Sequence, residues 1–218
     1  RADGVRVPTQ LPANVRPLHY TISAVPDAAN LRFTAHSRTD IEVIEATDTI
    51  TLNAAELEFQ TVAVTGPDGT VRRPTRISAD PEAQTATFRF AEPLPPGRHR
   101  LDIDYSGRIN TQAAGLFALD YQTGEGQKRA LFTQFEAPDA RRFFPGWDEL
   151  QFRTPYDLSV TVPAGEQACG NMPEGGHEPG PDGSTVIRFQ TTPAMSSYLL
   201  FLALGEFDRI TTTAAGTQ

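Results

Sequence analysis

Strict alternation of side-chain character from Leu31 to Val43 is the feature that most constrains the fold. One side of this stretch carries Leu31, Phe33, Ala35, Ser37, Thr39, Ile41 and Val43, and the other carries Arg32, Thr34, His36, Arg38, Asp40 and Glu42. Successive side chains of a strand point to opposite faces of its sheet. The pattern therefore predicts one long strand with one core face and one wet face.

The same period of two recurs along the chain. It is clear in "RLDIDY", "TATFRF" and "YDLSVTVP", and shorter strands are predicted for "TITL", "TVAVTG", "TVIRF" and "HYTISAV". "YLLFLAL" at Tyr198–Leu204 is apolar throughout, which is typical of a strand covered on both faces. "GPDGT" at 66–70, "GPDGS" at 180–184 and "PLPPGRH" have the residues that tight turns and chain breaks need.

No segment shows a sustained helical period. The nearest candidate is Pro138–Phe143, which allows one or two turns before Pro145 stops them. Together, about eight to twelve strands with short connections predict an all-β fold, specifically a large, twisted, saddle-like β-sandwich.

Composition limits the function classes. A chain of 218 residues can form one large all-β domain or two small ones. A net charge of −8 argues against a nucleic-acid partner. Cys169 is the single cysteine, so neither an internal disulfide nor a cysteine-built metal site is expected. No apolar run approaches the roughly 18 residues of a membrane span, which favours a soluble protein.

The start of the chain, "RADGVRVPTQLP", has no signal-peptide pattern and is interpreted as a loose lead-in over residues 1–10. The compartment stays open on this basis. An exported, periplasmic bacterial protein is one interpretation of this start and of the Ala-, Pro- and Arg-rich composition.

The usual catalytic motifs are missing from the sequence. His19, His36, His99 and His177 are the four histidines, and none lies three or four residues from another, as a local metal pair would require. "HEPGP" at His177 begins like a zinc-helix motif, but its prolines forbid the helix, so a loop is predicted there. No nucleophile elbow or phosphate-binding glycine loop is present.

One irregular stretch, "TQFEAPDARRFFPGWDEL" at Thr133–Leu150, concentrates four acids, two arginines, three phenylalanines and the single tryptophan. It resembles the signature of the N-terminal domain of the aminopeptidase N family, close to T-Q-F-E-P-x-D-A-R-R-x-F-P-C-x-D-E-P. These enzymes are gluzincin-type zinc metallopeptidases and include the puromycin-sensitive aminopeptidases. Supporting similarity lies in "LPANVRPLHYTI", "ATDTITLNAAELEF", "GLFALDY" and "TTPAMSSYLLFLALGEFD", so the resemblance covers Leu11 to Asp208.

Three positions depart from the family pattern. Gly146 stands where the family often has Cys, while Ala137 and Leu150 each stand where it often has Pro. None of these changes removes a charged or amide side chain. If the loop geometry is inherited, the resemblance implies an unusual backbone, a cis bond, at Glu136–Ala137 without the help of proline.

The resemblance implies that residues 11–208 are the N-terminal β-domain of a longer zinc aminopeptidase, and that residues 209–218 begin the linker to its catalytic domain. The His-Glu-x-x-His zinc helix of the family is absent from this sequence. Zinc would accordingly be bound by the catalytic domain of the same polypeptide, and this chain alone is expected to be inactive. Its implied partners are that domain and the N-terminus of a peptide substrate.

The resemblance also implies a role for two residues of this stretch as substrate-binding residues. A free peptide N-terminus is a cation with an ordinary pKa of about 8. Since zinc is itself cationic, a carboxylate must recognise that amine, and Glu136 occupies the matching position. Gln134 would line the pocket for the first side chain, with both a donor and an acceptor to offer. By strand alternation, Phe135 points away from both and packs into the core.

The rest of the stretch is expected to hold this loop rigid. Its arginines and the two acids that follow them predict a buried ion network formed by Arg141, Arg142, Asp148 and Glu149. Phe143, Phe144 and Trp147 are expected to pack beneath it, because functional carboxylates need a rigid supporting shell.

Two other functions remain open at this point. One is a β-sandwich module that binds glycans or cell surfaces through a platform of exposed Trp and Tyr. The other is a non-catalytic member of the family that keeps the fold as a scaffold. The presence of Gln134 and Glu136 argues against the scaffold.

Overall fold

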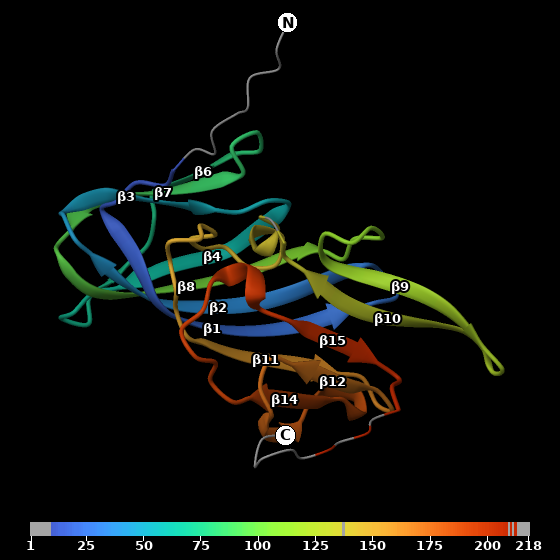
Figure 1. Ribbon diagram of the computed structural model, residues 1–218. Helices are drawn as coiled ribbons and strands as arrows, with labels where there is room; N and C mark the ends of the chain where they lie inside the picture. The colour runs from blue at the N-terminus through green and yellow to red at the C-terminus, as the bar shows by residue number, and fades with distance from the viewer. Residues whose placement is uncertain (1–9, 137, 209, 211, 213–218) are drawn as a thin grey trace, which may run out of the picture.

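The computed structural model of the chain describes residues 10–136, 138–208, 210 and 212. Within them are fifteen strands and three 3-10 helices, η1 (Ala140–Arg142), η2 (Pro181–Gly183) and η3 (Ser197–Leu199), and no α-helix (Figure 1). The prediction of an all-β fold is confirmed, and the short helical turn expected near Pro138–Phe143 is η1, whereas η2 and η3 were not predicted. None of the helices in the described part of the chain has the length and hydrophobicity of a membrane span.

The largest sheet has eight strands. In spatial order they are β13 (Glu174–Pro179), β14 (Thr185–Phe189), β11 (Tyr156–Val162), β1 (Val15–Asp27), β2 (Arg32–Val43), β8 (Gly97–Arg108), β4 (Leu57–Thr65) and β5 (Val71–Arg72). β1 and β11 run parallel, and every other neighbouring pair is antiparallel. The sheet twists across the whole molecule (Figure 1).

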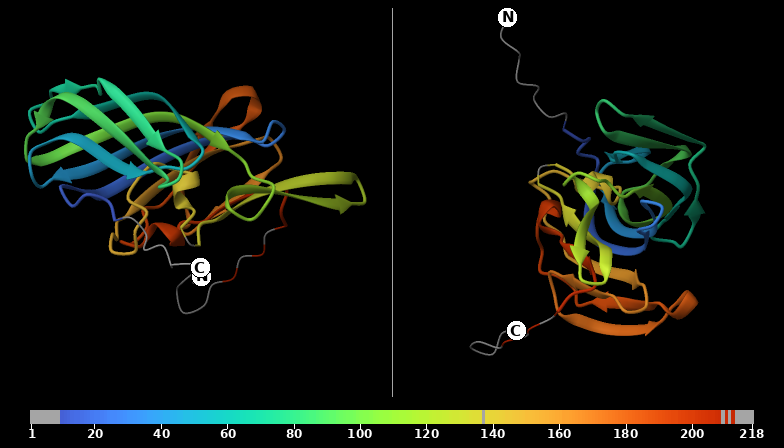
Figure 2. Two further views of the ribbon diagram at one scale, coloured as in Figure 1. Left: turned by 90° about the horizontal axis from the view of Figure 1, so that it is seen from above. Right: turned by 90° about the vertical axis from the view of Figure 1, so that its right-hand side faces the viewer.

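Two smaller sheets complete the described structure. One has four strands in the order β12 (Gln167–Gly170), β15 (Leu202–Gly205), β10 (Gly126–Gln134) and β9 (Gly115–Thr123). The other has three, β3 (Thr47–Asn53), β7 (Thr85–Leu94) and β6 (Arg76–Asp80). The β9–β10 hairpin projects from the body of the molecule (Figure 2), and β10 leads directly into the irregular stretch.

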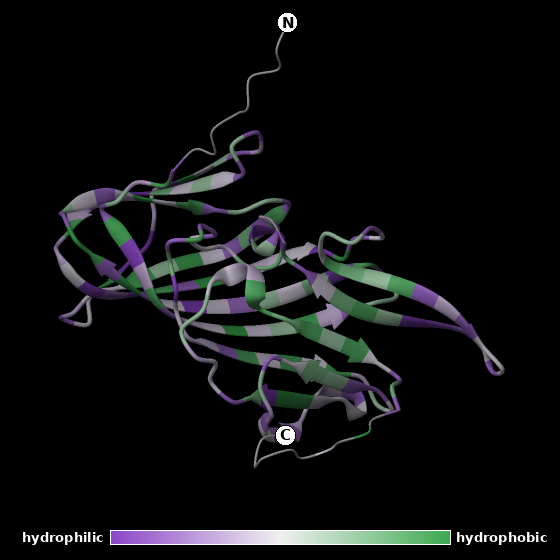
Figure 3. Ribbon diagram, in the orientation of Figure 1, coloured by the Kyte–Doolittle hydropathy of each residue, from purple (hydrophilic) through white to green (hydrophobic). Residues whose placement is uncertain are grey.

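Alternation predicts the faces of β2 correctly. Its core face is buried from Phe33 to Val43, while Arg32, Arg38 and Asp40 on the other face are exposed. Figure 3 shows the alternating hydrophilic and hydrophobic bands along the strands of this sheet. Leu31 lies outside the strand, in the preceding turn, with a left-handed φ of 52°.

The turns also agree with the sequence. The Gly66 N–H donates to the Thr70 carbonyl at 2.9 Å between β4 and β5, and the Gly180 N–H donates to the Ser184 carbonyl at 2.9 Å between β13 and β14. The strand count exceeds the predicted eight to twelve. Among the additional strands, β5 has two residues and β6 is exposed at every position, so neither carries an alternating pattern.

The prediction of one continuous strand over Tyr198–Leu204 is wrong. Its first half is the 3-10 helix η3, and only Leu202–Gly205 forms a strand. The Asn171 amide donates to the Leu199 carbonyl at 2.7 Å and accepts from the Phe201 N–H at 2.8 Å, which satisfies backbone groups that a ladder would otherwise use. Leu199 and Phe201 are 46% and 39% exposed, so this segment is not covered on both faces.

The prediction of a loop at His177 is also wrong. His177 and Glu178 belong to β13, the edge strand of the large sheet, which ends at Pro179. Proline forbids a helix interior, but it is tolerated on an edge strand, where no neighbour needs its missing N–H. The prolines therefore exclude a helix correctly, but they do not distinguish a loop from an edge strand.

Candidate functional site

Gln134 and Glu136 lie on either side of a buried phenylalanine. Gln134 is the last residue of β10, and both it and Glu136 are exposed, whereas Phe135 is 1% exposed. The predicted alternation at the end of this strand is thus confirmed. Two polar side chains are presented outward from a backbone that is fixed to the core by the residue between them.

The turn that carries Glu136 is closed by a main-chain hydrogen bond. The Asp139 N–H donates to the Phe135 carbonyl at 3.1 Å. The Phe135 ring stacks on Phe143 with a centroid distance of 5.6 Å, and Ala140 is fully buried. The turn is therefore anchored at both ends, while Ala137, where an unusual backbone is predicted, lies outside the described residues.

The strand before this turn is equally fixed. The Thr133 hydroxyl accepts from the Leu202 N–H at 2.9 Å and donates to the Leu202 carbonyl at 3.4 Å, which joins β10 to the start of β15. On the other side of β10, Gln134 is paired in register with Gly115 of β9. The backbone at Gln134 is thus fixed by hydrogen bonds on both sides of β10.

Arg141 and Asp148 form the best-connected ion pair of the stretch. Oδ2 of Asp148 accepts from the Arg141 N–H at 3.2 Å and from Arg141 Nε at 3.0 Å, and Arg141 Nη2 donates to the Asp148 carbonyl at 3.2 Å. The Ser197 hydroxyl donates to Oδ1 of Asp148 at 2.6 Å. The side chains of Arg141 and Asp148 are only 11% and 5% exposed, so this pair is the buried part of the predicted network.

The prediction that Arg142 and Glu149 join the same network is wrong. Arg142 Nε donates to Asp139 at 2.8 Å, and its Nη1 lies 3.3 Å from Glu56. The Glu149 carboxylate accepts instead from the N–H of Leu11 at 2.6 Å. The reason is geometric, because adjacent residues of a 3-10 turn point about 120° apart. Arg141 therefore pairs with Asp148, whereas Arg142 points away from it toward Asp139 and Glu56.

Aromatic side chains form the floor beneath the stretch, as predicted. Phe143, Phe144 and Trp147 are all at most 2% exposed. The Tyr20 hydroxyl accepts from the Trp147 N–H at 2.9 Å, and the Tyr105 hydroxyl donates to the Phe143 carbonyl at 2.9 Å. Burial raises the pKa of both Tyr20 and Tyr105 well above the usual 10.0, so both hydroxyls stay neutral.

The stretch is where the three sheets meet. Tyr20 and Tyr105 come from the eight-stranded sheet, Asn53 comes from β3 of the three-stranded sheet, and Gly115 comes from the four-stranded sheet. Asn53 exchanges two main-chain hydrogen bonds with Gly146, at 2.7 and 3.0 Å, and its side-chain oxygen accepts from the Asp148 N–H at 3.1 Å. Sequence reasoning missed these partners, because each is distant along the chain.

Gly146 allows the closest of these approaches. A Cβ added there would lie 2.7 Å from the Tyr20 hydroxyl oxygen and 2.8 Å from a carbon of its ring. Real Cβ atoms essentially never come so close. The glycine at this position is therefore matched to the Tyr20 ring, which also stacks on Tyr156 at a centroid distance of 5.0 Å.

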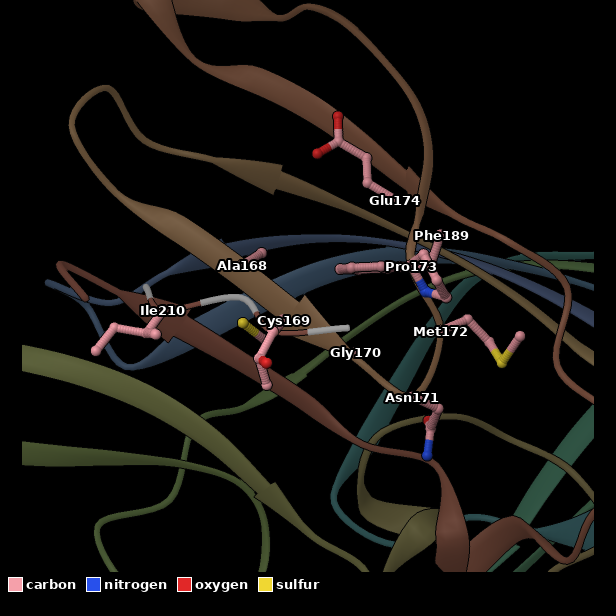
Figure 4. A pocket seen from close by; sticks show the side chains of 10 residues that line it. Ala168, Cys169, Gly170, Asn171, Met172, Pro173, Glu174, Phe189 and Ile210 are labelled. Carbon is pink, nitrogen blue, oxygen red and sulfur yellow. The ribbon is translucent and has the colours of Figure 1, made fainter. Parts of the chain in front are cut away.

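A cavity of about 370 Å³ lies elsewhere, beside β12 (Figure 4). Its lining residues are Ala168, Cys169, Gly170, Asn171, Met172, Pro173, Glu174, Phe189, Ile210 and Thr212. Neither Gln134 nor Glu136 is among them. Within the described part of the chain, no three or more His, Cys, Asp and Glu side chains come together as a metal site would require.

Comparison with known proteins adds evolutionary evidence to this geometry. The family model of the peptidase M1 N-terminal domain matches residues 16–199. Aminopeptidase N of Acetobacter pasteurianus is 38% identical over 213 residues, which cover 97% of this chain and 59% of that protein. Aminopeptidase M1-A of Oryza sativa subsp. japonica is 34% identical over 222 residues, covering 100% of this chain and 25% of that protein.

A third relative is the puromycin-sensitive aminopeptidase of Caenorhabditis elegans. It is 29% identical over 212 residues, covering 96% of this chain and 22% of that protein. The chain thus spans from 22% to 59% of the length of these three curated relatives. The likeness covers nearly the whole of this chain and a fraction of each relative.

Proposed function

This chain belongs to the peptidase M1 N-terminal domain family, and from that premise we propose that it is the N-terminal domain of a zinc aminopeptidase that removes N-terminal amino acids from peptides. Residues 11–208 form this domain in the proposal, and residues 209–218 begin the linker to a catalytic domain of the same polypeptide. The chain's homologues include several aminopeptidases. The observation that carries the proposal is the outward presentation of Gln134 from the end of β10 and of Glu136 from the turn that follows, on either side of the buried Phe135.

Glu136 binds the free α-ammonium group of the substrate in this account. At neutral pH a peptide N-terminus is mostly cationic, because its pKa is about 8. A carboxylate attracts that cation weakly in water and far more strongly once a second surface excludes water from the pair. The exposed Glu136 becomes such an anchor when the catalytic domain covers it.

Gln134 lines the pocket for the first side chain of the substrate. Its amide offers two donors and a carbonyl acceptor, and its position at the end of a doubly held strand limits how far it can move. The buried Phe135 ties the backbone on both of its sides to the core. The positions of Gln134 and Glu136 relative to each other are therefore held constant. Specificity at this pocket then comes from an amide attached to the backbone at a fixed point.

Enzymes of the M1 family depend on zinc. The described residues of this chain do not form a zinc site, since no three His, Cys, Asp or Glu side chains come together. In the proposal the metal is held by the catalytic domain, and the present chain contributes substrate binding alone. The partners are accordingly that domain and the N-terminus of a peptide.

The full-length protein provides the test. Purified full-length protein should release amino acids from aminoacyl-anilides, lose this activity on chelation and regain it with zinc. The Glu136→Gln variant should retain bound zinc and show a higher KM for the same substrates. Full-length protein with no hydrolytic activity at any zinc concentration would favour the scaffold function instead.

The alternative of a glycan- or surface-binding module loses its main support. Its platform requires an exposed tryptophan, yet Trp147 is 2% exposed and lies beneath the stretch. The main-chain N–H of Trp147 donates to the Tyr20 hydroxyl at 2.9 Å, which fixes the backbone that carries this buried side chain.

A further inference from the structure

Arg142 contacts the supports of both proposed substrate-binding residues. Its Nε donates to Oδ1 of Asp139 at 2.8 Å, and Asp139 closes the turn that carries Glu136. Its side chain also packs against Gly115, the register partner of Gln134. Arg142 is therefore placed to set Gln134 and Glu136 relative to each other, although among the described residues no hydrogen bond or ion pair joins it to either.

The carboxylate of Asp139 is committed to this arginine. Asp139 is the N-cap residue of η1, a position where Asp usually accepts a hydrogen bond from a main-chain N–H of the first turn. Here the side chain makes no such capping bond. The ion pair with Arg142 takes its place, so a side-chain contact supports the turn in addition to the main-chain hydrogen bonds that close it.

The contact with Gly115 is unusually close. Gly115 has a left-handed φ of 70°, and a Cβ added there would lie 2.8 Å from the Cβ of Arg142 and 3.5 Å from its Cδ. The aliphatic part of Arg142 thus lies against the bare backbone of β9 at the point where Gln134 is paired. A larger residue at position 115 would push these two elements apart.

Glu56 fixes the far end of the arginine. Its carboxylate lies 3.3 Å from Nη1 of Arg142, and the side chains are 48% and 22% exposed. Glu56 stands between β3 and β4 with a left-handed φ of 57°, a strained conformation for a residue with a side chain. The neighbouring Ala55 N–H donates to the Arg141 carbonyl at 2.9 Å, so this connection is attached to η1 at two points.

We propose that Arg142, held between Asp139 and Glu56, is a positioning residue for amine recognition by Glu136. This inference rests on the proposed function and adds a residue to it. The guanidinium matters in this role because its Nε and Nη1 reach the two carboxylates in fixed directions from one rigid plane, a geometry that the single nitrogen of a lysine does not reproduce. Arg142 acts through the turn, and Arg141 stabilises the domain through Asp148.

The test compares free and N-acetylated aminoacyl substrates with the full-length enzyme. Wild type, Arg142→Met, Glu136→Gln and the double variant are assayed, and the free-amine preference is the ratio of the two kcat/KM values. Arg142→Met should lower that preference about ten- to a hundredfold, because a small misplacement of a binding group has effects of this size. In the Glu136→Gln background the same change should have almost no further effect.

Arg129→Met is the matched control. Arg129 also pairs with an aspartate, Asp120, at 2.7 Å, and it lies on β10, the strand that ends at Gln134, away from the turn. This control should keep the wild-type preference for the free amine. Arg142→Lys, which retains the charge, provides a milder variant should Arg142→Met fail to fold, and it should reduce the preference by a smaller factor.

The outcomes separate the two proposals. If Glu136→Gln lowers the free-amine preference but Arg142→Met and Arg142→Lys leave it unchanged, the role of Arg142 is refuted and that of Glu136 stands. Losses that simply multiply in the double variant would show that Arg142 acts independently of Glu136, which also refutes the inference. If Glu136→Gln keeps the full preference, both proposals fall.

Discussion

The Asp148 carboxylate accepts both the main-chain N–H and the Nε of Arg141, at 3.2 and 3.0 Å, in a site where the two side chains are 5% and 11% exposed. Asp148→Ala would leave the Arg141 charge buried without its partner. We expect the free energy of unfolding to fall by about 3–5 kcal/mol. Urea unfolding followed by circular dichroism measures this change.

The matched control for that variant is Asp120→Ala, which removes one partner of the more exposed pair with Arg129. Water replaces a lost partner at such a site, so its effect should be much smaller. Equal effects of the two substitutions would contradict a structural role for the Arg141–Asp148 pair.

Gly146→Ala should destabilise the domain through a steric clash. The added Cβ would lie 2.7 Å from the Tyr20 hydroxyl oxygen, so the stacked tyrosine must shift. Overpacking of this kind costs about 1–3 kcal/mol. Gly124→Ala is the control, because nothing lies within 4 Å of its Cβ, and its effect should stay within about 0.5 kcal/mol. Equal unfolding midpoints for the two variants would rule out the close fit.

The buried tyrosines predict a loss of stability in alkali. Burial raises the pKa of Tyr20, Tyr105 and Tyr156 above the usual 10.0. Above pH 10 the unfolded chain releases these phenolic protons while the folded chain keeps them, so stability falls as the pH rises. Each such tyrosine lowers the free energy of unfolding by about 1.4 kcal/mol per pH unit.

Urea midpoints measured between pH 8 and 11 check this expectation. Tyr20→Phe should lower stability at pH 8, since the Trp147 N–H loses its acceptor. It should also make the alkaline decline shallower, because one fewer group titrates only in the unfolded chain. An unchanged alkaline slope in Tyr20→Phe would contradict the assignment.

The 218-residue chain on its own should fold and carry out no hydrolysis. Its three sheets share one hydrophobic core, so purified chain should give a β-type circular dichroism spectrum. It should bind no stoichiometric zinc and release no amino acid from aminoacyl-anilides. Hydrolysis by the isolated chain that persists in Glu136→Ala, with contaminating peptidase excluded, would overturn the proposed division of labour.

Strand patterns of period two allowed most of the fold to be predicted. The faces of β2 and the inward direction of Phe135 follow from alternation alone. The strand predicted from the continuous apolar run at Tyr198–Leu204 was wrong, because the Asn171 side chain bonds to the chain there and a 3-10 turn results. The loop predicted from the prolines at His177 was also wrong, because β13 lies at the edge of its sheet, where a proline is tolerated.

The sequence proposes residues for the candidate site but does not predict the contacts that hold them. The family signature points to Gln134 and Glu136, and local spacing suggests that the arginines and acids of the stretch pair with each other. The pairing of Arg142 with Glu56, and the fit of Gly146 to Tyr20, join segments that are distant in sequence. No local sequence pattern predicts these contacts, because they form only when the three sheets pack together.

The most direct test of the account compares wild-type full-length enzyme and Glu136→Ala on a free aminoacyl substrate and its N-acetylated form. The exposed Glu45→Ala serves as a control for loss of a surface carboxylate. Glu136→Ala should lower kcat/KM for the free substrate. The corresponding loss of transition-state stabilisation should be about 2–5 kcal/mol, as expected for a desolvated charge pair that loses one partner. Acetylation should cost the wild type and Glu45→Ala far more than it costs Glu136→Ala. An acetylation penalty in Glu136→Ala as large as in the wild type would show that Glu136 does not bind the amine.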